Sequence, residues 1–133
     1  MTNMKTLKTI ILAGLLALGL GCGYSKHATT PTVAGTMPNI TALAPNSMAA
    51  GSASFVLTVN GANFNGNAAI NWNGTAQTTT HVSANQLTAT IPASDVATAG
   101  TVTVTVTNPG TPGGIYGGGT TAQTSNSMTF TIN

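Results

Sequence analysis

The sequence predicts an all-β fold, an antiparallel β-sandwich, from two observations. From Phe55 onward apolar residues alternate with polar ones at a period of two, which is typical of strands with one buried face. Turn-forming pairs such as Asn73-Gly74 separate these short runs, and their close spacing favours a sandwich over a parallel sheet. After Gly21 no run has helical periodicity, and only Ser94–Val96 is predicted to form a single helical turn.

The predicted strands turn their apolar side chains inward and mostly threonine or asparagine outward, since a β-branched side chain suits the pleat. The inward residues are Phe55, Leu57 and Val59; Ile70 and Trp72; Leu87, Ala89 and Ile91; Val102, Val104 and Val106; Met128, Phe130 and Ile132. Turns are predicted at Asn60-Gly61, Asn65-Gly66, Asn73-Gly74, Ser83-Ala84-Asn85 and Asn108-Pro109-Gly110. This core is large enough for one modestly stable domain without disulfides.

The beginning of the chain has the layout of a secretory signal peptide, which we expect to be helical. Lys5 and Lys8 precede the apolar run 10–21, which ends in a glycine directly before Cys22. A membrane-spanning helix needs about 20 apolar residues, so this run is too short to be one. We therefore assign residues 1–21 to a signal peptide that is not part of the folded domain.

Cys22 is the only cysteine, so it has no disulfide partner within the chain. It is a free thiol, half of an intermolecular bridge, or a site of covalent attachment. The segment 18–22 resembles a bacterial lipobox, which implies lipidation of Cys22 and a membrane anchor; the alternative is an ordinary signal peptide that leaves an idle thiol. Because Gly23 stands where aspartate would favour inner-membrane retention, the resemblance implies the outer membrane. Residues 22–37 then form the lipidated cysteine and a flexible tether.

Composition excludes several classes of function. Charged residues make up 3% of the chain, and removal of the signal peptide leaves only Lys26 and Asp95 formally charged. Nucleic-acid binding requires several phosphate-neutralising cations, so no nucleic-acid partner is predicted. A nearly uncharged surface removes one defence against association, so weak self-association is expected. Disorder is not expected, because 41% of the residues are hydrophobic and they follow a regular pattern.

Several segments of the chain together resemble a known family. The segments that carry the resemblance are Pro38–Pro45, Gly51, Leu57–Phe64, Ile70–Thr75, Leu87–Pro92 and Val102–Asn108. In this order they look like an IPT/TIG domain over residues 38–133. The resemblance implies an immunoglobulin-like antiparallel sandwich of about seven strands, of the E-set type. Family members are usually non-catalytic parts of larger extracellular or DNA-binding proteins, whereas this chain shows one copy and lacks the basic loops that DNA binding needs.

Few side chains are candidates for chemistry. Trp72 shares the inward parity of Ile70 and is interpreted as core, although an exposed tryptophan could stack on a sugar; Phe64 is likewise interpreted as packing. Asp95 is the only acidic residue, which excludes paired-carboxylate chemistry and a carboxylate-rich calcium site, and we expect it to cap or stabilise its turn. His81 has no nearby set of metal ligands, and no nucleophile-elbow motif supports a Ser–His–Asp triad.

The stretch between Asn108 and Asn126 is longer than an ordinary hairpin connection and rich in glycine and proline. At its middle stand Ile115 and Tyr116, two large side chains with no obvious place to pack. Long loops on a rigid scaffold often carry binding, so residues 109–125 are a candidate binding loop. The alternative is a disordered insertion, which is tolerated because loop-closure entropy grows slowly with length.

These observations together predict a non-enzymatic, lipid-anchored protein of the bacterial cell envelope. It displays one domain for adhesion, structural or protein–protein contact, and no metal or cofactor is predicted. The expected partners are the membrane through Cys22, and an envelope protein, a glycan or a second copy that pairs with an exposed sheet edge. The alternative is a carbohydrate-binding module that uses Trp72 or Tyr116, and a hydrolase is a third hypothesis.

Overall fold

The computed structural model describes residues 33–133, so the signal peptide, Cys22 and most of the predicted tether lie outside the described residues. Seven strands of at least four residues form the framework. They are β2 (Asn39–Ala44), β4 (Phe55–Ala62), β5 (Ala69–Trp72), β7 (Thr79–Ser83), β8 (Gln86–Ile91), β9 (Gly100–Asn108) and β12 (Met128–Ile132). This agrees with the predicted number of about seven.

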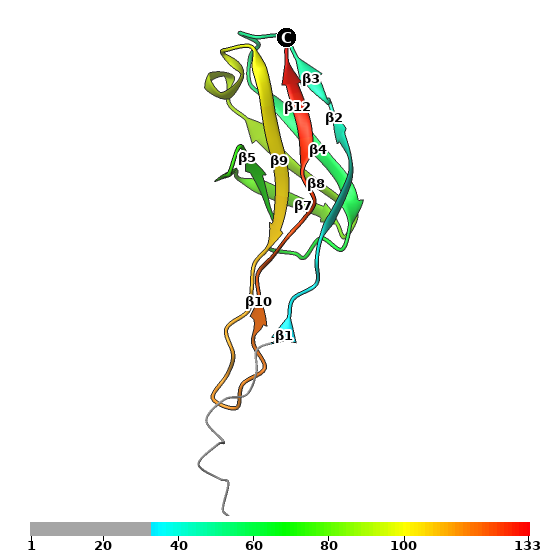
Figure 1. Ribbon diagram of the computed structural model, residues 1–133, viewed down its shortest axis with the longest axis vertical. Coiled ribbons are helices and arrows are strands. Elements are labelled where there is room, and N and C mark those ends of the chain that lie inside the picture. The colour runs from blue at the N-terminus through cyan, green and yellow to red at the C-terminus, as the bar shows by residue number, and fades with distance from the viewer. Residues whose placement is uncertain (1–32) are drawn as a thin grey trace, which may run out of the picture. The chain divides into compact units, whose positions relative to one another are not determined.

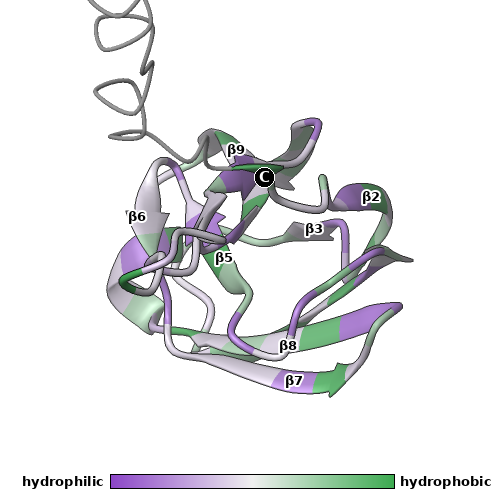
Figure 2. Cartoon of the chain, turned by 90° about the horizontal axis from the view of Figure 1, so that it is seen from below, coloured by the Kyte–Doolittle hydropathy of each residue, from purple (hydrophilic) through white to green (hydrophobic). Residues whose placement is uncertain are grey.

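The strands form two sheets that face each other. One sheet has the antiparallel order β2-β4-β8-β7. The other has the order β3-β12-β9-β5-β6, where β3 is Ser47–Met48 and β6 is Thr75–Ala76, and β11 (Gln123–Thr124) also pairs with β9. Figure 2 shows β7 and β8 in one layer and β3, β5 and β9 in the other. The β3–β12 pair is parallel, and every other pair within these two sheets is antiparallel, so the predicted sandwich is confirmed.

The core lies between the sheets. It contains the residues that the period of two turned inward and five buried residues outside the predicted runs, namely Ile40, Leu43, Phe64, Ala68 and Val96. The fully buried inward residues include Leu57, Val59, Leu87, Val104 and Val106. The remaining inward residues are also buried, except Phe55 and Met128, which are partly buried and pack against the core. Threonines between them face outward or are half-buried. The predicted inward parity is therefore confirmed along every run.

Three aromatic rings pack together inside the sandwich. The ring of Phe130 stacks on that of Phe55 with centroids 5.6 Å apart and lies 4.9 Å from that of Trp72. Phe55 meets Trp72 edge-on at 6.3 Å. Since these residues come from β4, β5 and β12, the cluster joins the two sheets, and such pairs add stability beyond the area that they bury.

The turns test the sequence predictions locally. Asn73 and Gly74 join β5 to β6 with φ of 49° and 85°, the left-handed conformations that a tight hairpin turn of type I′ requires. The turns at Asn65-Gly66 and at Ser83–Asn85 are also confirmed.

The predicted turn at Asn60-Gly61 is wrong, because β4 continues through these residues to Ala62. Gly61 pairs with Ile40 of β2, and Asn60 pairs with Gln86 of β8. A Cβ atom on Gly61 would lie 1.9 Å from the carbonyl oxygen of Asn39 and 2.6 Å from the Phe64 ring. This glycine therefore makes room for a close strand and a buried ring, and it does not reverse the chain.

A short 3-10 helix, η2 (Ala93–Val96), connects β8 to β9 and buries Val96. It confirms the single turn predicted at residues 94–96. Pro92 occupies its N-cap position and no side-chain hydrogen bond caps it, so Asp95 does not cap this turn. Asp95 lies in the first turn of η2, and its other predicted role, stabilising the turn, stays a prediction. No helix within residues 33–133 is both long and apolar enough to cross a membrane.

Candidate functional site

The predicted 109–125 loop forms a β-hairpin that extends beyond the sandwich (Figure 1), and we call it the 109–125 hairpin. Thr111 and Thr120 lie opposite each other and exchange two backbone hydrogen bonds of 3.0 Å each. Nearer the tip, the N–H of Gly114 donates to the carbonyl of Gly117 at 3.1 Å, and the N–H of Gly117 donates back at 2.9 Å. The segment is therefore a paired structure, in which glycine-rich sequence is held by main-chain hydrogen bonds.

Ile115 and Tyr116 occupy the tip, between the two paired glycines. They are 92% and 89% exposed, more than the other exposed large hydrophobic residues of the described chain, which are Val33, Met37, Val56 and Val82. The left-handed conformations that follow the turn fall on Gly117 and Gly118, with φ of 88° and 89°. The two large side chains are thus exposed to solvent, and the left-handed backbone beside them is unstrained because it falls on glycines. Their role in binding stays a prediction.

Gly119 shows why this hairpin tolerates so few side chains. It is buried, and a Cβ atom there would lie 2.6 Å from the backbone nitrogen of Gly113 and 2.7 Å from the carbonyl oxygen of Thr111. The two arms of the hairpin approach too closely for any larger residue at this position. Glycine here has a structural reason, and its abundance does not by itself mark a low-complexity insertion.

A third segment flanks the hairpin. Val33 and Ala34 form β1, which pairs in parallel with β10 (Thr120–Thr121), and the N–H of Val33 donates to the carbonyl of Gly119 at 3.1 Å. These two residues belong to the predicted tether. The chain therefore makes its first described contact at the hairpin and continues from there into the sandwich.

The base of the hairpin is fixed by Asn108, which is 1% exposed. Its Nδ2 donates to the carbonyl oxygens of Thr36 and Asn63, both at 2.8 Å, and its Oδ1 accepts from the backbone N–H of Asn65 at 3.0 Å. One amide thus ties the segment after β1 and the β4–β5 connection to the end of β9. From the sequence, Asn108 is predicted only as part of a turn.

The other arm returns to the sandwich through a second asparagine. The Oδ1 of Asn126 accepts from the N–H of Ile40 at 2.8 Å, and its Nδ2 donates to the carbonyl of Ile40 at 3.0 Å. A side-chain amide here pairs with both main-chain groups of one residue, as a neighbouring strand would. It does so beside the irregularity in β2 between Ile40 and Ala42.

The comparison with protein-family models decides the family. The model of the IPT/TIG domain matches residues 38–132, which include the whole sandwich and the 109–125 hairpin. The chain belongs to the IPT/TIG family. Neither the curated proteins nor the solved structures give a significant match to it.

Membership of the family indicates a general class of function. IPT/TIG domains are immunoglobulin-like and generally non-catalytic. An IPT/TIG domain indicates protein–protein or surface contact. For this IPT/TIG domain, the tip of the hairpin is the place where large apolar side chains are most exposed.

Trp72 lies in the core of this IPT/TIG domain, as its parity predicted. It is 4% exposed and packs against Phe130, so its ring offers no free face to a sugar. Trp72 also lines a pocket together with Asn73, Thr75, Asp95 and Val102. Phe64 is also buried, as predicted.

We expect the fluorescence of Trp72 to be nearly insensitive to acrylamide in the folded IPT/TIG domain, because its ring is shielded from solvent. Unfolding in urea should make it strongly quenchable. Since Trp72 is the only tryptophan, the measurement needs no substitution. Strong quenching of the folded protein would contradict the buried position.

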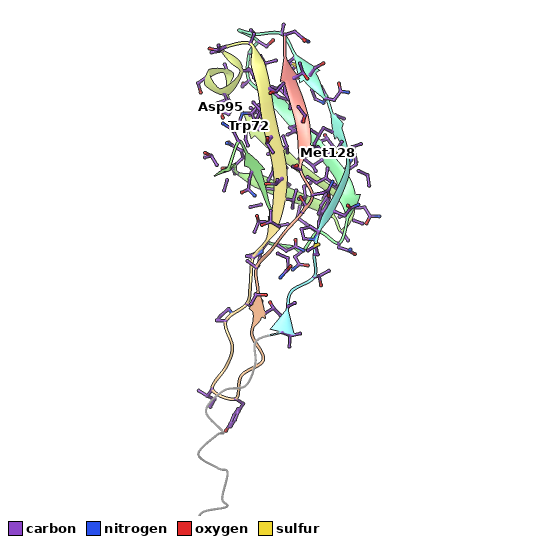
Figure 3. The ribbon with its side chains drawn as sticks, viewed as in Figure 1. Trp72, Asp95 and Met128 are labelled. Atoms are coloured by element: carbon purple, nitrogen blue, oxygen red, sulfur yellow. The ribbon has the colours of Figure 1, made fainter. Side chains whose placement is uncertain are left out.

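His81 and Asp95 do not form a common site with a nucleophile. A ring nitrogen of His81 lies 3.3 Å from the backbone oxygen of Phe64, on the exposed strand β7. Asp95 lies on η2 beside the pocket that Trp72 lines (Figure 3). Within residues 33–133 no three His, Cys, Asp or Glu side chains are grouped to hold a metal ion.

Proposed function

We propose that this chain is a non-enzymatic lipoprotein of the bacterial cell envelope that displays a single IPT/TIG domain for adhesion, structural or protein–protein contact. Its lipid is attached to Cys22, and its location is the outer membrane. The observation that carries the proposal is the placement of the only cysteine directly after a short apolar leader and shortly before the family match, which begins at residue 38.

Two further features support a contact function. The described surface is almost free of charge, since Asp95 is the only formally charged side chain in residues 33–133. The most exposed large apolar side chains, Ile115 and Tyr116, gather at the end of a projecting hairpin. Aromatic side chains of this kind are enriched where proteins meet partners.

The lipoprotein proposal is tested at the N-terminus of the mature protein. We expect mass spectrometry of the purified protein to show a chain that begins at an acylated Cys22, and fractionation to place it with the membranes. The Cys22→Ala variant should lose both the modification and the membrane association. The matched variant Gly23→Ser keeps the cysteine and should stay in the membrane fraction. An unmodified Cys22, or a mature N-terminus elsewhere, would refute the anchor.

The carbohydrate-binding alternative now depends on Tyr116, because the ring of Trp72 is buried. Binding on a glycan array that Tyr116→Ala abolishes without loss of folding would favour this alternative. Turnover that survives purification and disappears in His81→Ala would instead favour a hydrolase.

A further inference from the structure

We infer that the tip of the 109–125 hairpin, Ile115 and Tyr116, inserts into the phospholipid surface that carries the anchor. The hairpin would then be a second, non-covalent membrane contact, and it would fix the orientation of the sandwich relative to the membrane. This inference rests on the proposed function, in which Cys22 holds the lipid. The partner of the tip is then a lipid headgroup region without net charge.

The direction of β1 supports this inference. Because β1 is parallel to β10, it runs from the tip side of the hairpin toward the sandwich, with Val33 opposite Thr120 and Ala34 opposite Thr121. Val33, the first described residue, is therefore the end of β1 that lies nearer the tip. Figure 1 shows the C-terminus at the opposite end of the sandwich. The N-terminal end of the described chain and the hairpin tip consequently lie at the same end of the domain.

The lengths also agree. Eleven residue steps separate Cys22 from Val33. A coil of that length spans about 18 Å on average and at most about 36 Å. From Thr120, opposite Val33, to Tyr116 the hairpin extends by four residues, or about 14 Å at strand geometry. A lipid at Cys22 thus places the membrane surface within easy reach of the tip.

The chemistry of the tip suits a lipid interface. Ile115 supplies an apolar side chain, and Tyr116 is of the type that gathers at headgroup level, with an apolar ring and a polar hydroxyl. Residues 109–126 contain no charged side chain, so insertion desolvates no ion. The glycines that flank the tip, Gly114 and Gly117, satisfy each other's backbone groups by two hydrogen bonds. Unpaired backbone would otherwise oppose entry into an apolar layer.

Insertion of two side chains would be too weak to hold a freely diffusing protein. The anchor changes this, because a short tether gives the second contact an effective concentration in the ~mM range. The tip then needs only a modest preference for lipid over water. Since Asn108 and Asn126 fix both arms of the hairpin to the sandwich, insertion of the tip would orient the whole domain.

The test uses mature chains, residues 22–133, coupled through the Cys22 thiol to a maleimide lipid in phosphatidylcholine vesicles. Tryptophan replaces the tip residue in Tyr116→Trp, and the matched control is Ala50→Trp. Ala50 is exposed and its N–H donates to the carbonyl of Asn133, so it lies at the C-terminal end of the sandwich. Wild-type protein, with Trp72 buried, supplies the baseline. The readout is quenching of tryptophan emission by phospholipids brominated near the headgroup.

We expect brominated lipid to remove most of the emission that Tyr116→Trp adds, and to shift the remaining emission to the blue. The emission that Ala50→Trp adds should stay unquenched. Changing Ile115 to serine in the Tyr116→Trp chain should reduce the quenching. Equal quenching of the two tryptophan variants, or none in either, would overturn the inference and leave a protein or glycan as the partner of the tip.

The coupling chemistry separates this inference from the proposed function. Maleimide supplies the anchor in the vesicles, so the quenching does not depend on whether cells acylate Cys22. An unmodified Cys22 in cells would therefore refute the lipoprotein proposal while the quenching data stand. An acylated Cys22 with an unquenched tip would refute only the insertion of the hairpin.

Discussion

Replacing Phe130 by alanine is expected to destabilise the domain by about 3–5 kcal/mol, a large part of the ~5–15 kcal/mol that holds a domain of this size together. Phe130 is fully buried and contacts the rings of both Phe55 and Trp72. The substitution removes the ring that joins the two sheets and leaves a cavity which the surrounding strands can close only in part. If the wild-type stability lies at the lower end of this range, a substantial fraction of the variant is unfolded at room temperature.

Urea denaturation followed by Trp72 fluorescence measures this effect directly, because Trp72 is a neighbour of the substituted ring. Phe130→Leu keeps most of the apolar volume and should lose less stability than the alanine variant. The control is Val56→Ala, since Val56 is 56% exposed on the outer side of β4 and should change stability by no more than about 0.5 kcal/mol. A midpoint for Phe130→Ala close to that of Val56→Ala would show that the ring cluster is not a stabilising contact.

The success of the sequence analysis came from hydropathy parity. In a chain with so little charge, the large apolar residues are the strongest signal, and a one-residue shift would turn all of them to solvent. Val102, Val104 and Val106 illustrate this, because the threonines between them leave only one face that can be buried. The core residues of these runs could therefore be predicted from the sequence, whereas Ile40 and Leu43 of β2 lie outside the predicted runs and were missed.

The errors came from polar residues and glycines, whose roles depend on contacts distant in the chain. The Asn60-Gly61 pair has high turn propensity, but pairing with β2 on one side and β8 on the other keeps the chain extended. Strand β7 was not predicted, because Thr79–Ser83 is an edge strand whose only apolar residue, Val82, is exposed. Local propensity does not record which strand will lie alongside.

The candidate site was predicted in part. The exposure of Ile115 and Tyr116 followed from their isolation among glycines, and the structure confirms it. The pairing of the hairpin arms could not be predicted, because backbone hydrogen bonds between glycine-rich arms leave no alternation in the sequence. The amides that fix its base also carry no hydropathy signal in a chain that contains many exposed asparagines.

Asn108 offers the sharpest test of how the hairpin is held to the sandwich. We expect Asn108→Ala to destabilise the domain by about 2–4 kcal/mol, because it leaves two carbonyl oxygens and one N–H without their partner in a nearly solvent-free position. The amide protons of Val33 and Asn65 should also exchange faster with solvent. Asn67→Ala is the matched control, since Asn67 is an exposed asparagine of the β4–β5 connection and its substitution should have little effect.

The variant Asn108→Asp separates the loss of the donor from the loss of the side chain. Its carboxyl oxygen can still accept from the N–H of Asn65, but the second oxygen faces the carbonyls of Thr36 and Asn63, where Nδ2 donated. Burial and these carbonyls disfavour the ionised form, so the pKa of the introduced carboxyl should rise above the usual ~3.9 of aspartate.

The sign of the pH dependence follows from that direction. With a folded-state pKa above the unfolded one, the Asn108→Asp variant keeps the contribution of its protonated carboxyl below about pH 4 and loses it as the pH rises through the folded-state pKa. The urea midpoint of this variant should therefore fall further below that of wild type as the pH is raised from 3 to 8. If the gap between the two proteins stays constant over that range, Nδ2 of Asn108 is not the donor that joins the hairpin base to Thr36 and Asn63.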